Sequence, residues 1–146
     1  MTDSWDWGTA ITLFSSAYLA KSDWFLLAKT IPDAGGWNNF LTVELTTSGA
    51  PSAARIKKVE VRCLVYHQYV GDLVIQLTTY QNGRWYDGTL RSRSGGSADD
   101  INTNEVLTND TTWTGLDPNA TWYLKIGDFA FGDEGKLKQW EIKVYY

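Results

Sequence analysis

The side chains best able to do chemistry are a single histidine and a few aspartates. His67 is the only histidine of the 146 residues, and Cys63 is the only cysteine. A serine-type triad needs a nucleophile, an imidazole base and an orienting acid, so His67 is the only candidate base. The chain has no Gly-x-Ser-x-Gly motif, and we expect a structural role for His67 at a strand end. One His and one Cys cannot complete a usual zinc site.

The aspartates beside glycines suggest a different chemistry. Asp72 follows Gly71, which is expected to let the chain turn sharply. Asp128 and Asp133 lie in a later turn rich in acids and glycine. Such residues can bind Ca²⁺ through side-chain and backbone oxygens, or they can cap their own turns. Three carboxylates close together would repel, so they either lie apart or share a cation.

The corner formed by His67, Gly71 and Asp72 can also be purely structural. In that interpretation His67 closes one strand, and Asp72 holds the start of the next by accepting backbone amides.

Aromatic side chains near turns are candidates for ligand binding. The chain has eight Trp, eight Tyr and five Phe. Stacking on a sugar is one role for such residues on a β-sandwich. Because Trp is usually largely buried, core packing is the alternative for each. The candidates for a ligand surface are Trp37, Trp85, Tyr86 and Trp113.

Composition excludes several classes of protein. The net charge of -4 and a pI of about 4.9 leave no basic patch for nucleic acid. The longest apolar runs are far shorter than the roughly 20 residues of a membrane helix. The N-terminus carries acids and no Lys or Arg, so it is not a signal peptide. Cys63 has no partner for an intrachain disulfide and is expected to be a buried thiol.

Alternation of apolar and polar residues predicts short strands. In Ile56–Tyr66, the side chains of Val59, Val61, Cys63 and Val65 face one way, which is typical of a half-buried antiparallel strand. Further strands are predicted at Asp23–Ile31, Phe40–Leu45, Asp72–Thr79, Trp85–Leu90, Glu105–Thr108, Thr121–Gly127 and Lys136–Tyr146.

The connections between these strands also follow from local sequence. Ser15–Ala20 permits a short helical turn, and Gln81–Gly83 predicts a tight Asn-Gly hairpin. Arg91–Asn104 is long, polar and rich in Gly and Ser, so it is expected to be an exposed loop. Eight or nine short strands without a long helix predict an all-β sandwich or barrel.

Five segments resemble, in the same order, the P domain (homo-B domain) of subtilisin-like proprotein convertases and bacterial secreted peptidases. The stretch from His67 to Leu77 is similar to the His-x-x-x-Gly-Asp-Leu strand of that family. The other four segments are Ile31–Asp33, Ile56–Val61, Thr121–Asp128 and Asp133–Ile142, the last being similar to a closing Asp-x-Gly-x-Leu-x-x-Trp pattern.

The resemblance implies an antiparallel jelly-roll β-sandwich of eight to nine strands over residues 31–146, with residues 1–30 as an extension packed on or beside it. It further implies a non-catalytic module that stabilises or targets a partner peptidase, calcium as a candidate cofactor, and a secreted or cell-surface location. Two alternatives stay open if the chain is complete. One is a free-standing module that binds a carbohydrate or another surface. The other is a structural or assembly protein that makes contacts through residues 1–30.

Overall fold

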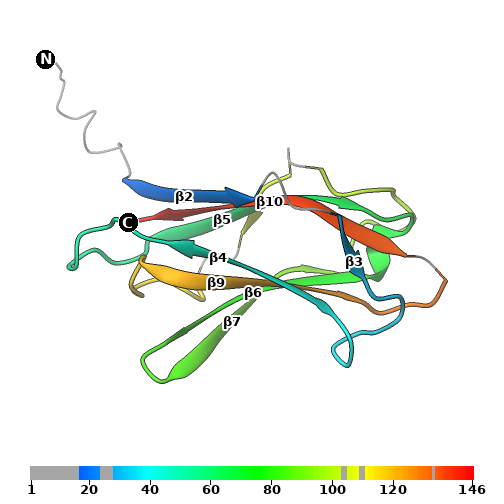
Figure 1. Ribbon diagram of the computed structural model, residues 1–146, viewed down its shortest axis with the longest axis horizontal. Helices are drawn as coiled ribbons and strands as arrows, with labels where there is room; N and C mark the ends of the chain where they lie inside the picture. Colours follow the sequence, from blue (N-terminus) through cyan, green and yellow to red (C-terminus); the bar gives the residue numbers. More distant parts are fainter. Residues whose placement is uncertain (1–16, 24–27, 103–104, 109–110, 133) are drawn as a thin grey trace, which may run out of the picture.

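The computed structural model describes residues 17–23, 28–102, 105–108, 111–132 and 134–146. Two antiparallel sheets lie face to face in a β-sandwich, with the β4 layer below the β10 layer in Figure 1. The strands are β2 (Tyr18–Asp23), β3 (Lys29–Ile31), β4 (Leu41–Thr47), β5 (Lys58–Tyr66), β6 (Leu73–Gln81), β7 (Arg84–Ser92), β8 (Leu107–Thr108), β9 (Ala120–Asp128) and β10 (Gly135–Tyr145). A single turn of 3-10 helix, η1 (Val70–Asp72), precedes β6.

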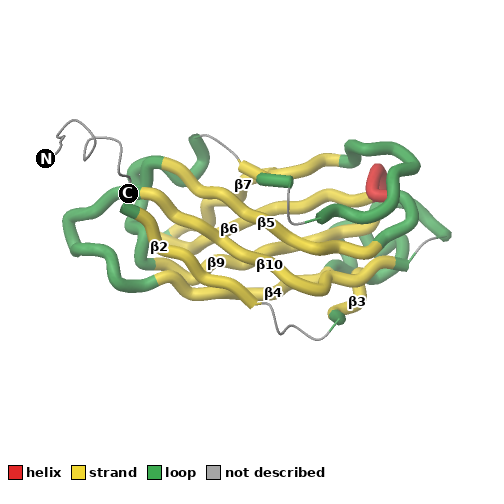
Figure 2. The backbone as a smooth tube through the Cα atoms, turned by 90° about the horizontal axis from the view of Figure 1, so that it is seen from above, coloured by secondary structure: helices red, strands yellow, loops and turns green. Residues whose placement is uncertain are grey.

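The strand order explains how distant parts of the chain meet. One sheet has five strands in the order β2-β10-β5-β8, with β3 also paired to β10. The other has the order β4-β9-β6-β7, and Figure 2 shows it beneath the first. The structure therefore confirms the predicted antiparallel β-sandwich. No helix in the described part of the chain is long and apolar enough to cross a membrane.

The core forms because strands of both sheets turn their apolar faces inward. The predicted inward face of β5 is confirmed, since Val59, Val61, Cys63 and Val65 are all buried. β10 pairs with β5 and buries Trp140 against the same core, together with Ile142 and Val144. Period-2 alternation places these side chains on one face.

The thiol of Cys63 is enclosed in this core. Burial raises its pKa to about 12, and the negative charge of Glu105 raises it as well. Because the thiolate is the reactive form, we expect no labelling of the folded protein by iodoacetamide at pH 8, and complete labelling in denaturant. Mass spectrometry checks this, with Cys63→Ser as the unlabelled control. Rapid labelling of the folded chain would contradict the burial.

Two features of the N-terminal and loop regions differ from the sequence prediction. The helical turn predicted at Ser15–Ala20 is wrong over Tyr18–Ala20, which belongs to β2 and pairs with the edge of β10. Pairing with β10 gives hydrogen-bond partners to backbone N–H and C=O groups that a short isolated helix would leave without partners. The predicted loop at Arg91–Asn104 begins later, because β7 continues to Ser92.

The hairpin between β6 and β7 is confirmed at the predicted residues. Asn82 has φ 53° and Gly83 has φ 78°, so both occupy the left-handed region. This is the conformation of a two-residue turn whose twist matches that of the strands. The hairpin places Trp85 directly opposite Tyr80.

Candidate functional site

The corner from His67 to Asp72 carries the chain from one sheet to the other. β5 ends at Tyr66 in the five-stranded sheet, and β6 starts at Leu73 in the four-stranded sheet. The corner lies at the end of the sandwich away from the C-terminus (Figure 1). Two backbone hydrogen bonds hold the corner against a neighbouring loop. The amide of Val70 donates to the carbonyl of Ala98 at 3.1 Å, and the amide of Gly71 donates to the carbonyl of Gly96 at 2.9 Å.

Gly71 is needed here for close packing. A Cβ at Gly71 would lie 2.8 Å from the backbone nitrogen and oxygen of Gly96. Gly71 is not among the residues with positive φ. Gly71 does lie in a turn, the 3-10 turn η1, but no positive φ requires glycine there. Glycine is needed because the backbone of Gly96 leaves no room for a side chain.

His67 forms a fully buried pair with Asp128. Its Nε2 lies 3.0 Å from Oδ2 of Asp128, and both side chains are 0% exposed. The backbone amide of Tyr69 donates to Nδ1 of His67 at 3.0 Å. Since an amide can only donate, Nδ1 carries no proton, and Nε2–H donates to the carboxylate. Both ring nitrogens are thus in use, so the imidazole is not free to act as a base.

Asp128 links this corner to the turn between β9 and β10. Its Oδ1 accepts a hydrogen bond from the amide of Ala130 at 3.1 Å. Its backbone oxygen accepts from the amide of Gly36 at 2.8 Å. Both carboxylate oxygens therefore meet protein N–H groups, which satisfies a buried charge. The pair fixes the position of residues that follow Asp128.

The predicted calcium ligands are only partly placed by the structure. Asp72 is buried at the end of η1, and Asp128 is occupied by His67. Asp133 lies outside the described residues. Among the residues that are described, no group of three or more His, Cys, Asp or Glu side chains could hold a metal ion. Calcium binding stays a prediction.

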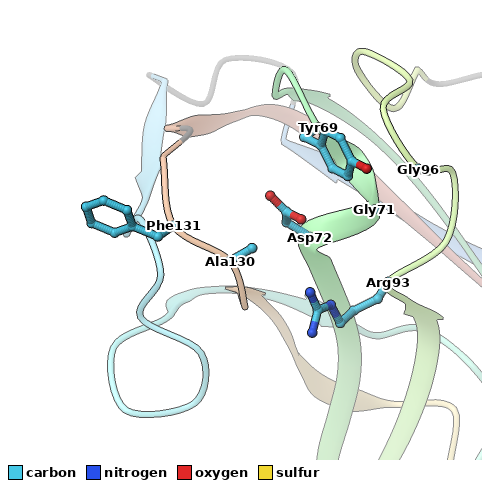
Figure 3. A pocket seen from close by; sticks show the side chains of 7 residues that line it. All are labelled: Tyr69, Gly71, Asp72, Arg93, Gly96, Ala130 and Phe131. Atoms are coloured by element: carbon cyan, nitrogen blue, oxygen red, sulfur yellow. The ribbon is translucent and has the colours of Figure 1, made fainter.

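A pocket of about 590 Å³ opens beside the corner. Figure 3 shows the carboxylate of Asp72 pointing into the space between Tyr69 and Arg93. Arg93 has φ 52°, a conformation that is rare outside glycine and is often found at functional sites. The ring of Phe131 stands at the opposite side with 88% of its surface exposed. The lining residues are Tyr69, Gly71, Asp72, Arg93, Gly96, Ala130 and Phe131.

Arg93 and Phe131 were not singled out by the sequence analysis. Arg93 lies in a polar loop, where the local sequence does not distinguish a functional arginine from a solvent-exposed one. Phe131 precedes Gly132 in a turn of small and acidic residues, and a large apolar side chain in such a turn is the signal that could have found it.

The four predicted ligand-binding aromatics do not form one exposed surface. Trp85 and Trp37 are exposed, and Tyr86 is half-buried against the core with the guanidinium of Arg84 at 4.3 Å from its ring. Trp113 is 1% exposed, and its indole N–H donates to the carbonyl of Tyr86 at 3.0 Å. Trp113 is therefore a core residue and does not belong to an exposed ligand surface.

Comparison with known families decides what this fold belongs to. Residues 56–144 match the model of the proprotein convertase P-domain, and this range is more than half of the chain. The chain belongs to the proprotein convertase P-domain family. The match covers the His67 corner, the pocket and the strand that contains Asp128.

Two curated relatives of this P domain carry the name calcium-dependent protease. The protein of Trichormus variabilis (strain ATCC 29413 / PCC 7937) is 36% identical over 92 residues, which is 61% of this chain. The protein of Nostoc sp. (strain PCC 7120 / SAG 25.82 / UTEX 2576) is 35% identical over 92 residues. In each case the match spans only 14% of the relative's length.

Solved structures share the fold at low sequence identity. A serine protease of Aeromonas sobria matches with a TM-score of 0.70 and 18% identity, over 89% of this chain and 27% of that chain. The same protease in complex with the chaperone ORF2 matches with a TM-score of 0.67 and 18% identity. This match covers 93% of this chain and 29% of that chain. FLHE matches with a TM-score of 0.56 and 12% identity, over 90% of this chain and 96% of its own.

Proposed function

We propose that this P domain is a non-catalytic accessory module that docks on a peptidase domain and stabilises it. The family match over residues 56–144 carries the proposal. The names of the two curated relatives support a peptidase as the partner. A secreted or cell-surface location stays a prediction, and so does the alternative of an assembly role for residues 1–30.

The pocket beside the His67 corner is the proposed docking point. Phe131 presents a large apolar surface on a turn whose start is held by Asp128. Exposed aromatic side chains of this kind are typical anchors in protein interfaces. Asp72 and Arg93 line the same pocket and offer one group of each charge, which can orient a partner.

The test measures binding of the purified domain to the calcium-dependent protease of Trichormus variabilis from which the segment that matches this domain has been removed. Isothermal titration calorimetry is expected to show binding that Phe131→Ser weakens by about thirtyfold, which corresponds to a hot-spot loss of about 2 kcal/mol. Tyr66→Ala is the matched control, because Tyr66 is also exposed but lies on β5. Binding that is absent, or that Phe131→Ser leaves unchanged, would overturn the proposal.

Calcium forms a second part of this proposal. If Asp72 contributes to a calcium site, the melting temperature is expected to be higher in calcium than in chelator, because a ligand that binds only the native state stabilises it. Asp72→Asn is expected to remove the difference. Glu44→Gln, which changes an acid on β4, serves as the control. Identical melting curves in calcium and in chelator would rule out the site.

A further inference from the structure

A second pocket lies on the outer face of the four-stranded sheet. Its volume is about 320 Å³, which is at the lower end of the range for small-molecule sites. It shares no lining residue with the pocket beside the His67 corner. The residues that line it are Phe40, Thr42, Thr78, Trp85, Asp87, Tyr123 and Lys125.

The register of the sheet builds this groove from four strands. Glu44 on β4 is opposite Tyr123 on β9, Tyr123 is opposite Thr78 on β6, and Thr78 is opposite Asp87 on β7. Paired residues on neighbouring strands share a face, so these side chains form one row across the sheet. Tyr123 is the aromatic residue of this row, and Trp85 near the start of β7 contacts its ring.

The rings in the groove are held in place by one another. Trp85 is 51% exposed and meets Tyr80 edge-on at 5.2 Å between ring centroids, and Tyr123 at 5.6 Å. Both arrangements are favoured geometries for aromatic pairs. At the far side, Phe40 lies 5.3 Å from Trp37. The aromatic surface is therefore fixed before any ligand arrives.

Polar groups stand among these rings. The hydroxyl of Thr78, which is buried, donates to Oδ1 of Asp87 and so orients this carboxylate. The ammonium of Lys125 lies 5.3 Å from the ring centroid of Phe40. The groove lining thus holds one acid and one base, and Glu44 lies beside it opposite Tyr123, so no excess of positive charge attracts a phosphate or another anion.

We infer that this groove binds a neutral polysaccharide. A sugar ring has an apolar face of C–H groups that suits an indole, and an edge of hydroxyls that suits carboxylate, ammonium and threonine hydroxyl groups. The cores of protein interfaces are depleted in charged residues. Because Asp87 and Lys125 line the groove together with its rings, a glycan fits this lining better than a protein partner does.

The test is calorimetric titration of the purified chain with cellohexaose, laminarihexaose, maltohexaose and mannohexaose. At least one of these neutral sugars is expected to bind. Trp85→Ala is expected to weaken that binding by about tenfold or more, since it removes a stacking platform. Asp87→Asn is expected to weaken it to a smaller extent. Tyr66→Ala, with an exposed ring on the other sheet, is the matched control and should bind as the unmodified chain does.

Melting curves accompany the titration and show that each variant is folded. The inference is overturned if none of the four sugars binds, or if a sugar binds equally well to the Trp85→Ala variant. It is also overturned if Trp85→Ala weakens binding to the peptidase domain while no sugar binds, because the face is then a protein interface. Failure of the peptidase experiment with Phe131→Ser would leave this result untouched.

Discussion

Replacing His67 by alanine is expected to destabilise the domain by about 3 kcal/mol, because a buried carboxylate then loses a hydrogen-bond donor. The reason is that Asp128 stays fully buried with only the amide of Ala130 to stabilise its charge. Urea unfolding followed by circular dichroism measures the loss. The turn that carries Phe131 follows Asp128, so we also expect weaker docking of a partner.

A double-mutant cycle separates the pair from other effects of the substitution. Asp128→Asn keeps an oxygen for Nε2 of His67 but loses the charge. If the pair is the cause, the variant with both changes is less destabilised than the sum of the single variants. Tyr66→Ala, at an exposed neighbouring position, controls for general changes at the strand end. A loss below about 1 kcal/mol for His67→Ala would contradict a dry, buried pair.

The strands could be predicted from sequence because their signal is local. Along β5, and along β10 from Trp140 to Val144, the apolar residues recur at every second position, and such a pattern needs no knowledge of the partner strand. A register shift between Leu137 and Gln139 interrupts the pattern nearer the start of β10. The Asn82-Gly83 turn is equally local, since only a few residues tolerate two consecutive left-handed conformations. These elements together define the sandwich.

The partner of His67 could not be predicted in this way. The sequence indicated a structural histidine, but Asp128 lies 61 positions further along the chain. The two residues meet because Asp128 at the end of β9 is opposite Leu73, where β6 begins. This register depends on how two distant strands pair, and no local pattern encodes it.

At β2 the sequence prediction was wrong because the local pattern was too short to distinguish a helical turn from a strand. Six residues from Ser15 to Ala20 are compatible with one helical turn, but an isolated turn of this length is unstable. The edge of β10 offers a row of backbone groups, and Tyr18 pairs there with Tyr145. Tertiary pairing therefore determines the conformation.

The tryptophans could not be sorted from sequence, because Trp85 and Trp113 both lie near turns. Packing against Gly88 distinguishes them, since a Cβ at Gly88 would lie 2.3 Å from Cζ2 of Trp113. A glycine inside a strand often marks such a close approach. The sequence analysis did not use Gly88, and a glycine in a strand would not have shown which ring is buried.

The Trp113→Ala variant is expected to lose about 3–5 kcal/mol of stability, the usual range for removing a large aromatic side chain from a core. The indole is 1% exposed and packs edge-on against Trp122 at 5.9 Å. Its N–H also bonds to the carbonyl of Tyr86, so the change leaves a cavity and an unpaired acceptor. Thermal and urea unfolding measure the loss.

Trp85→Ala is the matched comparison, because it removes the same ring from the outer face of the adjacent hairpin strand. We expect less than about 1 kcal/mol of destabilisation, since the side chain is half exposed. The two variants should thus separate stability from ligand binding: Trp113→Ala affects the first, and Trp85→Ala affects the second. Equal losses of stability would mean that Trp85 is itself part of the packed structure. Its position in the groove would then be explained by folding, with no need for a ligand.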